Sequence, residues 1–215
     1  MDAIILLAGK GTRLNAPINK VLLDLNGKPV FKYSLDLLKK LVDNIILVIS
    51  PQDEALIAPY LDESIKIAYG GPERYLSVYN GVLASNSNKV LIHDGARPNV
   101  NLEKLQELLS YSNDYDALML AYEEKNTIYE LNGEKLIPLE RNKIVLAATP
   151  QIVDRGLYLK AVEKAKKDLF RPTDDISLLL NLDPNLKVKY VMDEGNLKIT
   201  NPIDLSLAKM VVKND

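Results

Sequence analysis

The sequence of 215 residues contains no cysteine, no tryptophan and a single histidine. The absence of cysteine excludes structural disulfides, thiolate zinc sites and cysteine nucleophiles, and it fits a cytosolic enzyme. One histidine leaves little room for a histidine-based metal centre or a catalytic triad. No apolar run approaches the ~20 residues of a membrane-spanning helix, and the first residues enter a predicted strand with no basic segment and cleavage site. We therefore expect the protein in the cytoplasm.

Acidic and basic side chains nearly cancel, since 29 Asp and Glu oppose 27 Lys and Arg and leave a formal net charge of −2. Such a balance gives no general attraction to nucleic acid or to a membrane surface. Hydrophobic residues at 47% and charged residues at 26% are ordinary for a globular protein. The length is sufficient for one sizeable core, so we expect a single domain over residues 1–215.

The segment from Leu6 to Pro29 contains the most informative pattern of the chain. A buried strand is predicted at residues 3–7, and it runs into Ala8-Gly9-Lys10-Gly11. Glycines permit a sharp turn and bring backbone N–H groups close to a ligand, and Arg13 and Lys20 add further positive charge. Two glycines alone would be an ordinary turn between a strand and a helix. Together with the cations they favour a nucleoside triphosphate site.

Two familiar phosphate-binding motifs do not occur in the sequence. No stretch has the Walker pattern G-x-x-x-x-G-K-[ST], and a dinucleotide fingerprint would need glycine or alanine where Leu14 stands. The pattern that is present is AGKGTRL, then Lys20, then LNGKP at residues 25–29. It resembles the signature of nucleotidyltransferases that activate sugars and polyol phosphates.

Apolar segments alternate with amphipathic ones along most of the chain. Strands are predicted at residues 3–7, 44–49, 64–68, 89–93 and 188–192. Helices are predicted at residues 30–42, 51–60, 77–85, 156–167 and 174–182, and from residue 202 onward. This alternation is typical of a parallel α/β sheet, in which ligands bind at the carboxyl ends of the strands.

Residues 122–147 interrupt the alternation after a strand-like segment that begins at Asp116. They are predicted to form short alternating strands with Asn132-Gly133 as a hairpin turn. Their apolar side chains are too few to form a core of their own. We interpret the segment as a β-arm that reaches a partner subunit in a homodimer, and a solvent-facing hairpin is the alternative.

Further sequence blocks make the resemblance more specific. They are GGPERYLSVYNG at residues 70–81, VLIHDGARP at 90–98, TPQ at 149–151, TDD at 173–175 and NLKIT at 196–200. From about Ala3 to the C-terminal helix, the chain resembles the 2-C-methyl-D-erythritol 4-phosphate cytidylyltransferase family. The ribitol-5-phosphate cytidylyltransferases share nearly all of these blocks. Both families transfer a cytidylyl group from CTP to a polyol phosphate and release pyrophosphate.

The resemblance implies a Rossmann-like nucleotide-diphospho-sugar transferase fold with a mostly parallel sheet and a protruding β-arm. It implies catalytic roles at the triphosphate or transferred phosphate for Arg13, Lys20 and Lys198. It implies nucleotide binding by Ala8, Gly9, Lys10, Gly11, Gly71 and Ser77. It implies that Asp94 holds Mg²⁺, and that Arg97, Thr127 and Arg141 bind the acceptor, the last two across a dimer interface. The alternative role for Arg97 is to fix its loop.

The expected chemistry explains these residue types. The attacking phosphate oxygen of the acceptor is already ionised, so no general base is needed. Catalysis then consists of positioning and of charge stabilisation by cations, oriented N–H groups and magnesium. Rival functions are polyol-phosphate cytidylyl transfer to ribitol 5-phosphate, a UTP- or GTP-dependent nucleotidyltransferase, and a non-catalytic nucleotide-binding module.

Three positions depart from the pattern of the family. Asn19 replaces the proline that usually precedes the catalytic lysine, and Gly95 replaces an alanine, which we expect to make its loop more pliable. Gly195 stands where the family has a second magnesium-binding aspartate. Two alternatives are open: Asp193 or Glu194 substitutes for it, or Asp94 acts alone.

Other polar residues in these blocks are interpreted as structural. His93 is expected to orient its strand end without taking part in catalysis. Asp174 and Asp175 stand at the start of a predicted helix, where acidic residues favour the helix dipole, so both are expected to act as caps.

Overall fold

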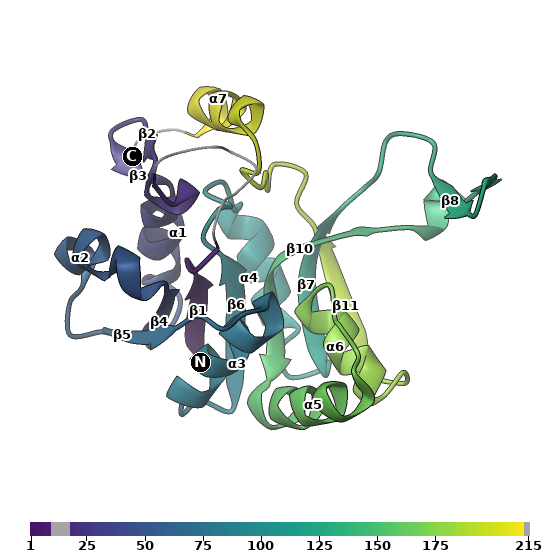
Figure 1. Ribbon diagram of the computed structural model, residues 1–215, viewed down its shortest axis with the longest axis horizontal. Helices are drawn as coiled ribbons and strands as arrows, with labels where there is room; N and C mark the ends of the chain where they lie inside the picture. Colours follow the sequence, from purple (N-terminus) through teal and green to yellow (C-terminus); the bar gives the residue numbers. More distant parts are fainter. Residues whose placement is uncertain (10–17, 213–215) are drawn as a thin grey trace.

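The computed structural model describes residues 1–9 and 18–212 (Figure 1). Its centre is a seven-stranded sheet with the order β11-β7-β10-β6-β1-β4-β5. The strands are β1 (Asp2–Leu6), β4 (Asn44–Ile49), β5 (Ile65–Tyr69), β6 (Lys89–Asp94), β7 (Ala117–Tyr122), β10 (Leu146–Asp154) and β11 (Val188–Met192). Only β10 runs antiparallel to its neighbours β6 and β7. The prediction of a mostly parallel α/β sheet is confirmed.

The central strand β1 is buried on both faces because its side chains alternate between two cores. Ala3 and Ile5 pack with α1 (Val30–Leu38) and α4 (Leu102–Ser110). Ile4 packs on the other face with α3 (Arg74–Ala84), α5 (Arg155–Asp168) and α6 (Asp175–Leu182). A parallel strand that is covered by helices on both sides has this continuous apolar sequence.

Some helix boundaries differ from the sequence prediction. The helix α1 ends at Leu38 instead of residue 42, and α4 was not predicted. Residues 51–60 form three short pieces, η3 (Pro51–Asp53), α2 (Glu54–Ile57) and η4 (Ala58–Tyr60). Pro59 lacks the N–H group that a continuous helix would require at that point, so the helix breaks.

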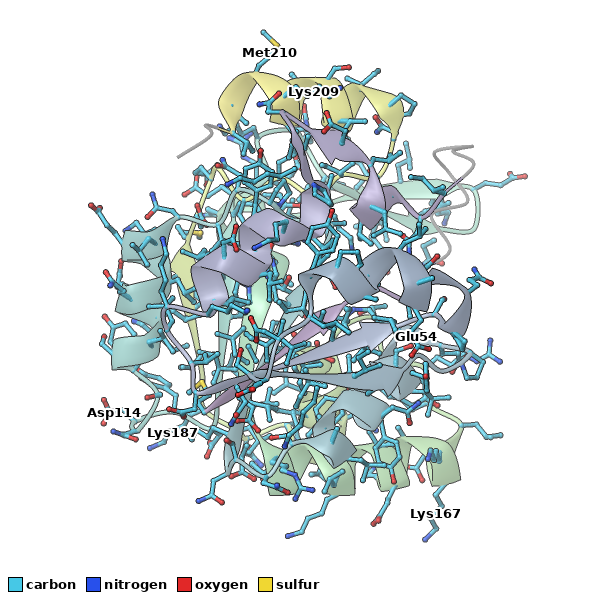
Figure 2. All side chains as sticks on the ribbon, turned by 90° about the vertical axis from the view of Figure 1, so that its left-hand side faces the viewer. Glu54, Asp114, Lys167, Lys187, Lys209 and Met210 are labelled. Carbon is cyan, nitrogen blue, oxygen red and sulfur yellow. The ribbon has the colours of Figure 1, made fainter. Side chains whose placement is uncertain are left out.

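A third, smaller core joins segments from the two ends of the sequence. The last helix, α7 (Pro202–Val211), lies beside β2 (Asp24–Leu25) and β3 (Lys28–Pro29) in Figure 1, and Leu25 packs there with Ile199 and Ala208. The opposite face of α7 points away from the body, as Lys209 and Met210 show in Figure 2. This core places residues 20–29 against the segment that contains Lys198.

The predicted hairpin forms and projects from the body between β7 and β10 (Figure 1). It consists of β8 (Tyr129–Asn132) and β9 (Lys135–Pro138), followed by the short helix η5 (Arg141–Lys143). Gly133 adopts a positive φ of 62°, which suits the turn. Leu131 is 73% exposed and Leu136 is 63% exposed, so the apolar residues of the arm find no core within the chain.

Within the described ranges 1–9 and 18–212, no helix has the length and apolar character needed to cross a membrane.

Candidate active site

A cleft of about 480 Å³ opens at the carboxyl ends of β1 and β6. Among the predicted site residues, it is lined by Ala8, Gly9, Lys20, Gly71, Ser77, Asp94 and Lys198. Three further predicted residues, Lys10, Gly11 and Arg13, lie outside the described part of the chain. Thr127 and Arg141 lie exposed on the arm and do not line the cleft.

One wall of the cleft is a tight turn after β5 that leaves no space for side chains. A Cβ atom on Gly70 would lie 2.4 Å from the Cβ of Ala8, and one on Gly71 would lie 2.8 Å from the Cβ of Leu76. The N–H group of Gly71 donates to Ser77 Oγ at 2.9 Å. The glycines therefore allow the backbone of this turn to approach the end of β1, where Ala8 begins the predicted phosphate-binding segment.

The opposite wall contains a carboxylate surrounded by cations. Asp94 Oδ1 lies 3.3 Å from Arg74 Nε, and Asp94 Oδ2 lies 2.7 Å from Lys198 Nζ and 3.8 Å from Arg97 Nε. Burial alone would raise the pKa of Asp94, but the charges of Arg74, Lys198 and Arg97 hold that pKa well below its usual range. Asp94 is therefore an anion throughout the physiological pH range.

Arg74 is a site residue that the sequence analysis missed. Its Nη2 atom donates to Asp175 Oδ2 at 2.8 Å, and Asp175 is fully buried and also accepts from Tyr158 OH at 3.2 Å. The prediction that Asp175 caps a helix is wrong, since its carboxylate turns inward to Arg74. Asp174 does cap α6, because its Oδ1 accepts the N–H of Ser177 at 2.8 Å. The GGPER block, which includes Arg74, was the available signal.

Lys20 reaches the cleft from the other end of the sequence. It begins the short helix η2 (Lys20–Leu22), and its Nζ atom donates to the carbonyl oxygen of Ile199 at 2.9 Å. This contact joins the segment after residue 18 to the segment of Lys198. Both lysines therefore face the same space.

The expectation that Gly95 makes its loop pliable is wrong. A Cβ atom there would lie 2.3 Å from Leu7 Cδ2, and the N–H of Gly95 donates to the carbonyl of Leu6 at 3.1 Å. Glycine at this position allows close packing of the turn against β1, which holds Asp94 in place.

His93 is buried beneath the cleft and has the structural role expected from the sequence. Its Nε2 atom lies 2.9 Å from Ser34 Oγ and its Nδ1 atom lies 3.3 Å from Thr149 Oγ1. Thr149 Oγ1 also accepts the N–H of Asp94 at 3.0 Å. Burial lowers the pKa of His93 to about 4, so the ring is neutral at physiological pH.

A second cavity of about 310 Å³ lies on the far side of Lys198, which lines both spaces. Arg97 also lines it, but this side chain is 5% exposed and its Nη1 atom donates to the carbonyl of Asn196 at 2.8 Å. Arg97 thus fixes the loop that precedes Lys198. The Oδ1 atom of Asn196 is buried there without a hydrogen-bond partner among the described residues.

Neither proposed substitute for the missing aspartate lies in the cleft. Asp193 Oδ2 accepts the N–H of Asn101 at 3.1 Å, and Glu194 Oε1 accepts the N–H of Glu123 at 3.1 Å. Within residues 1–9 and 18–212 no three acidic, histidine or cysteine side chains group as a metal site. Mg²⁺ is commonly held by one or two carboxylates plus substrate phosphates. Asp94 therefore fits a metal that is shared with a bound triphosphate.

A backbone-lined pocket next to lysine and arginine side chains, at the carboxyl edge of an α/β sheet, suits a nucleoside triphosphate. The fold and this pocket are those of a nucleotidyltransferase, and comparison with known proteins identifies the family. Residues 1–214 match the family model of 2-C-methyl-D-erythritol 4-phosphate cytidylyltransferase. The chain belongs to this family.

Individual relatives agree with this assignment. The enzyme of that name from Geobacillus thermodenitrificans is 37% identical over 222 residues, covering 98% of this chain and 96% of the relative. The one from Caldanaerobacter subterraneus is 36% identical and covers 99% of each. The crystal structure of 4-diphosphocytidyl-2C-methyl-D-erythritol synthase from Anaerococcus prevotii superposes with a TM-score of 0.86 and 30% identity, covering 97% of this chain and 96% of that chain.

Replacing Arg74 should destabilise the fold because Asp175, whose pKa burial already raises, would lose the cation that compensates its buried carboxylate. We expect Arg74→Gln to lower the free energy of unfolding by roughly 3–5 kcal/mol in urea titrations. Arg171→Gln is the matched control, since the Arg171 side chain is 85% exposed and lies 3.6 Å from Glu73, and it should change stability little. Equal stabilities of the two variants would contradict the role of Arg74.

The buried ring of His93 should remain neutral far below the usual histidine pKa. It is the only histidine, so its ring C–H signals in NMR need no assignment by mutation. We expect the chemical shifts of the ring to titrate with a pKa of about 4 in the folded protein, against about 6.5 in the unfolded chain. Because the unfolded chain binds the proton first, this group's contribution to stability is lost as pH falls from 6.5 towards 4. A midpoint near 6.5 would contradict the buried neutral ring.

Proposed function

We propose that this protein transfers a cytidylyl group from CTP to 2-C-methyl-D-erythritol 4-phosphate, with release of pyrophosphate, in isoprenoid precursor synthesis. The observation that carries the proposal is the placement of Lys20, Asp94 and Lys198 around one cleft in a chain of this family. Retention of these groups argues against a non-catalytic nucleotide-binding module. The relatives described above carry the methylerythritol phosphate name, which favours this acceptor over ribitol 5-phosphate.

The reaction forms a bond between an acceptor phosphate oxygen and the α-phosphorus of CTP, and the bond from that phosphorus to the pyrophosphate oxygen breaks. The attacking oxygen is already ionised, so no proton needs to be removed. The chain's contribution is positive charge and alignment. Lys20 and Lys198 provide this charge in the cleft, and the neutral, buried His93 is not required as a base.

The two walls of the cleft are proposed to bind different parts of CTP. Ala8, Gly71 and Ser77 offer backbone and hydroxyl groups to the cytosine and its ribose. Gly9 begins the segment that receives the triphosphate, to which Lys10, Gly11 and Arg13 are assigned by the family pattern. Asp94 and the phosphates would together hold Mg²⁺. The metal ion would supply additional positive charge at the phosphates.

The acceptor is proposed to bind on the other side of Lys198. That lysine lines both cavities and its Nζ contacts Asp94, so bound phosphates would compete with the carboxylate for the ammonium group. Arg97 supports this side by fixing the preceding loop through the Asn196 carbonyl. A phosphate held there would lie between the acceptor cavity and the nucleotide cleft.

The arm is proposed to complete this acceptor site in a homodimer. Leu131, Leu136 and Ile137 are exposed on a two-stranded sheet, and an isolated hairpin of this size is marginal in water. A two-fold mate offers the same apolar surface in return. Thr127 and Arg141 would then contact the neighbour's acceptor, where a guanidinium can bind phosphate in a bidentate manner. Because CTP is a cytosolic metabolite, the cytoplasm is the proposed location.

Pyrophosphate release tests the substrate assignment. The four common nucleoside triphosphates are each combined with 2-C-methyl-D-erythritol 4-phosphate or ribitol 5-phosphate, with magnesium or with EDTA. We expect turnover with CTP, 2-C-methyl-D-erythritol 4-phosphate and magnesium, because the cleft must recognise the base and one carboxylate must share the metal. Equal turnover with UTP, preference for ribitol 5-phosphate, or no turnover with CTP would overturn the assignment.

Subunit mixing tests the shared acceptor site. Lys20→Ala should lower kcat by on the order of 10²–10³, the usual effect of removing one group that stabilises developing charge. If Arg141 serves the neighbour's site, mixing Arg141→Ala with Lys20→Ala subunits puts both lesions in one site of each mixed dimer. Random exchange should then restore roughly a quarter of wild-type activity.

The control mixture combines Lys20→Ala with Lys198→Ala subunits. Both residues line the cleft of their own chain, so every site in that mixture remains damaged. Failure of the Arg141→Ala mixture to exceed this control, after subunit exchange is demonstrated, would remove Arg141 from the neighbour's site.

A further inference from the structure

The side chain of Asn19, the residue directly before Lys20, has partners in three segments. Its Nδ2 atom donates to the carbonyl oxygen of Leu7 at 2.5 Å and to Asp53 Oδ2 at 2.9 Å. Its Oδ1 atom accepts the N–H of Val21 at 3.4 Å and caps the helix η2. Two acceptors on one side and a donor on the other fix the orientation of the amide.

Both acceptors lie just beyond the carboxyl ends of central strands and are held firmly there. Leu7 directly follows β1, is fully buried, and its own N–H donates to the Val48 carbonyl at 2.8 Å. Asp53 lies in η3, shortly after β4, and is 7% exposed. Its N–H donates to the Ser50 carbonyl at 3.0 Å. The amide of Asn19 therefore connects the ends of two neighbouring strands to the start of η2.

The backbone of Asn19 does not itself require asparagine. Its φ of −56° and ψ of 130° are an extended conformation that any residue adopts. Its side-chain hydrogen bonds are therefore what distinguishes this residue. On the far side of Lys20, Val21 is 3% exposed and packs in the core, so both neighbours of the lysine are held in place.

We propose that Asn19, oriented by the buried carboxylate of Asp53, is a positioning residue that sets the backbone position from which Lys20 reaches the cleft. A lysine side chain is flexible along its four-carbon stem, so its ammonium group reaches a defined place only if the backbone of the residue is held in position. In this structure the backbone position of Lys20 lets its Nζ atom donate to the carbonyl oxygen of Ile199 at 2.9 Å. The catalytic consequence rests on the role of Lys20 in the proposed function, whereas the positioning itself does not.

The sharpest variant is Asn19→Asp, which keeps the size of the side chain and its capping oxygen. It removes the amide donor to Leu7 and places a second carboxylate against Asp53. Because misplacing a catalytic group by about 1 Å can cost on the order of 10²-fold, we expect kcat to fall roughly 10- to 100-fold. The KM for CTP should change by less than about threefold if the loss is confined to the transition state.

Exchange of the two side chains provides a rescue. The double variant Asn19→Asp/Asp53→Asn restores a donor and an acceptor between positions 19 and 53 and removes the repulsion of like charges. We expect it to regain part of the lost kcat. A double variant that is as slow as Asn19→Asp, or slower, would show that Asp53 does not orient residue 19.

The matched control uses the same pair of strands at their amino ends. Asn44 Nδ2 donates to Asp2 Oδ1 at 2.9 Å, so Asn44→Asp creates a similar acid pair between β1 and β4 on the edge opposite the cleft. It should lower thermal stability while kcat stays within about twofold of wild type, since the catalytic groups do not move. An equal fall in kcat for both variants would assign the effect to general stability and overturn the proposal.

A second measurement does not depend on any substrate. Acetylation of Lys20 by a small reagent, followed by mass spectrometry of the nucleotide-free protein, should be faster in Asn19→Asp than in wild type and unchanged in Asn44→Asp. If the wild type fails to use CTP but this difference is seen, the proposed function falls and the positioning role stands. Unchanged acetylation together with unchanged kcat would overturn the positioning role. Should Asn19→Asp not fold, Asn19→Ala replaces it in both measurements.

Discussion

The interaction on which the cleft depends is the encirclement of the Asp94 carboxylate by Arg74, Lys198 and Arg97. A lone charge in such a buried place would be strongly unfavourable, and the surrounding cations offset that cost. Each cation comes from a different segment, and the N–H of Asp94 is held by Thr149 of β10. Asp94 therefore connects β6 to α3 and to the segment after β11 through its carboxylate, and to β10 through its backbone N–H. The fold thus packs around a buried carboxylate that also lines the cleft.

Local pattern was sufficient to predict much of the sheet. Five of the six residues of β4, from Ile45 to Ile49, are a continuous buried apolar run, and such a run has few alternatives to a central strand. The helical segment expected at residues 51–60 has those bounds, but it consists of α2 between two short 3-10 turns, and Pro59 lies in the last of them. The β8–β9 hairpin was predictable from Asn132-Gly133, since a turn is determined by neighbouring residues.

Side-chain partners were not predictable in the same way. Arg74 and Asp175 are separated by 101 positions and Asn19 and Asp53 by 34, and no local pattern links them. Asp175 also looked like a cap because it stands beside a true cap, Asp174. The positions of Lys20, Asp94 and Lys198 were indicated by family resemblance, and the structure added what holds them there. Sequence thus identified candidate groups, while the buried contacts between distant segments required the fold.

The contact between Lys20 and the Ile199 carbonyl spans 179 positions of the chain. Contacts of such long sequence separation form late, because closing the long intervening loop costs entropy before the contact can stabilise the fold. During synthesis, β5, β4, β1 and β6 can pair, and β10 and β7 can then join them, while the segment around Ile199 does not yet exist. The cleft is then completed only when that segment docks beside β2 and β3. A nascent chain would thus be folded in large part before it has a site that can hold two substrates together.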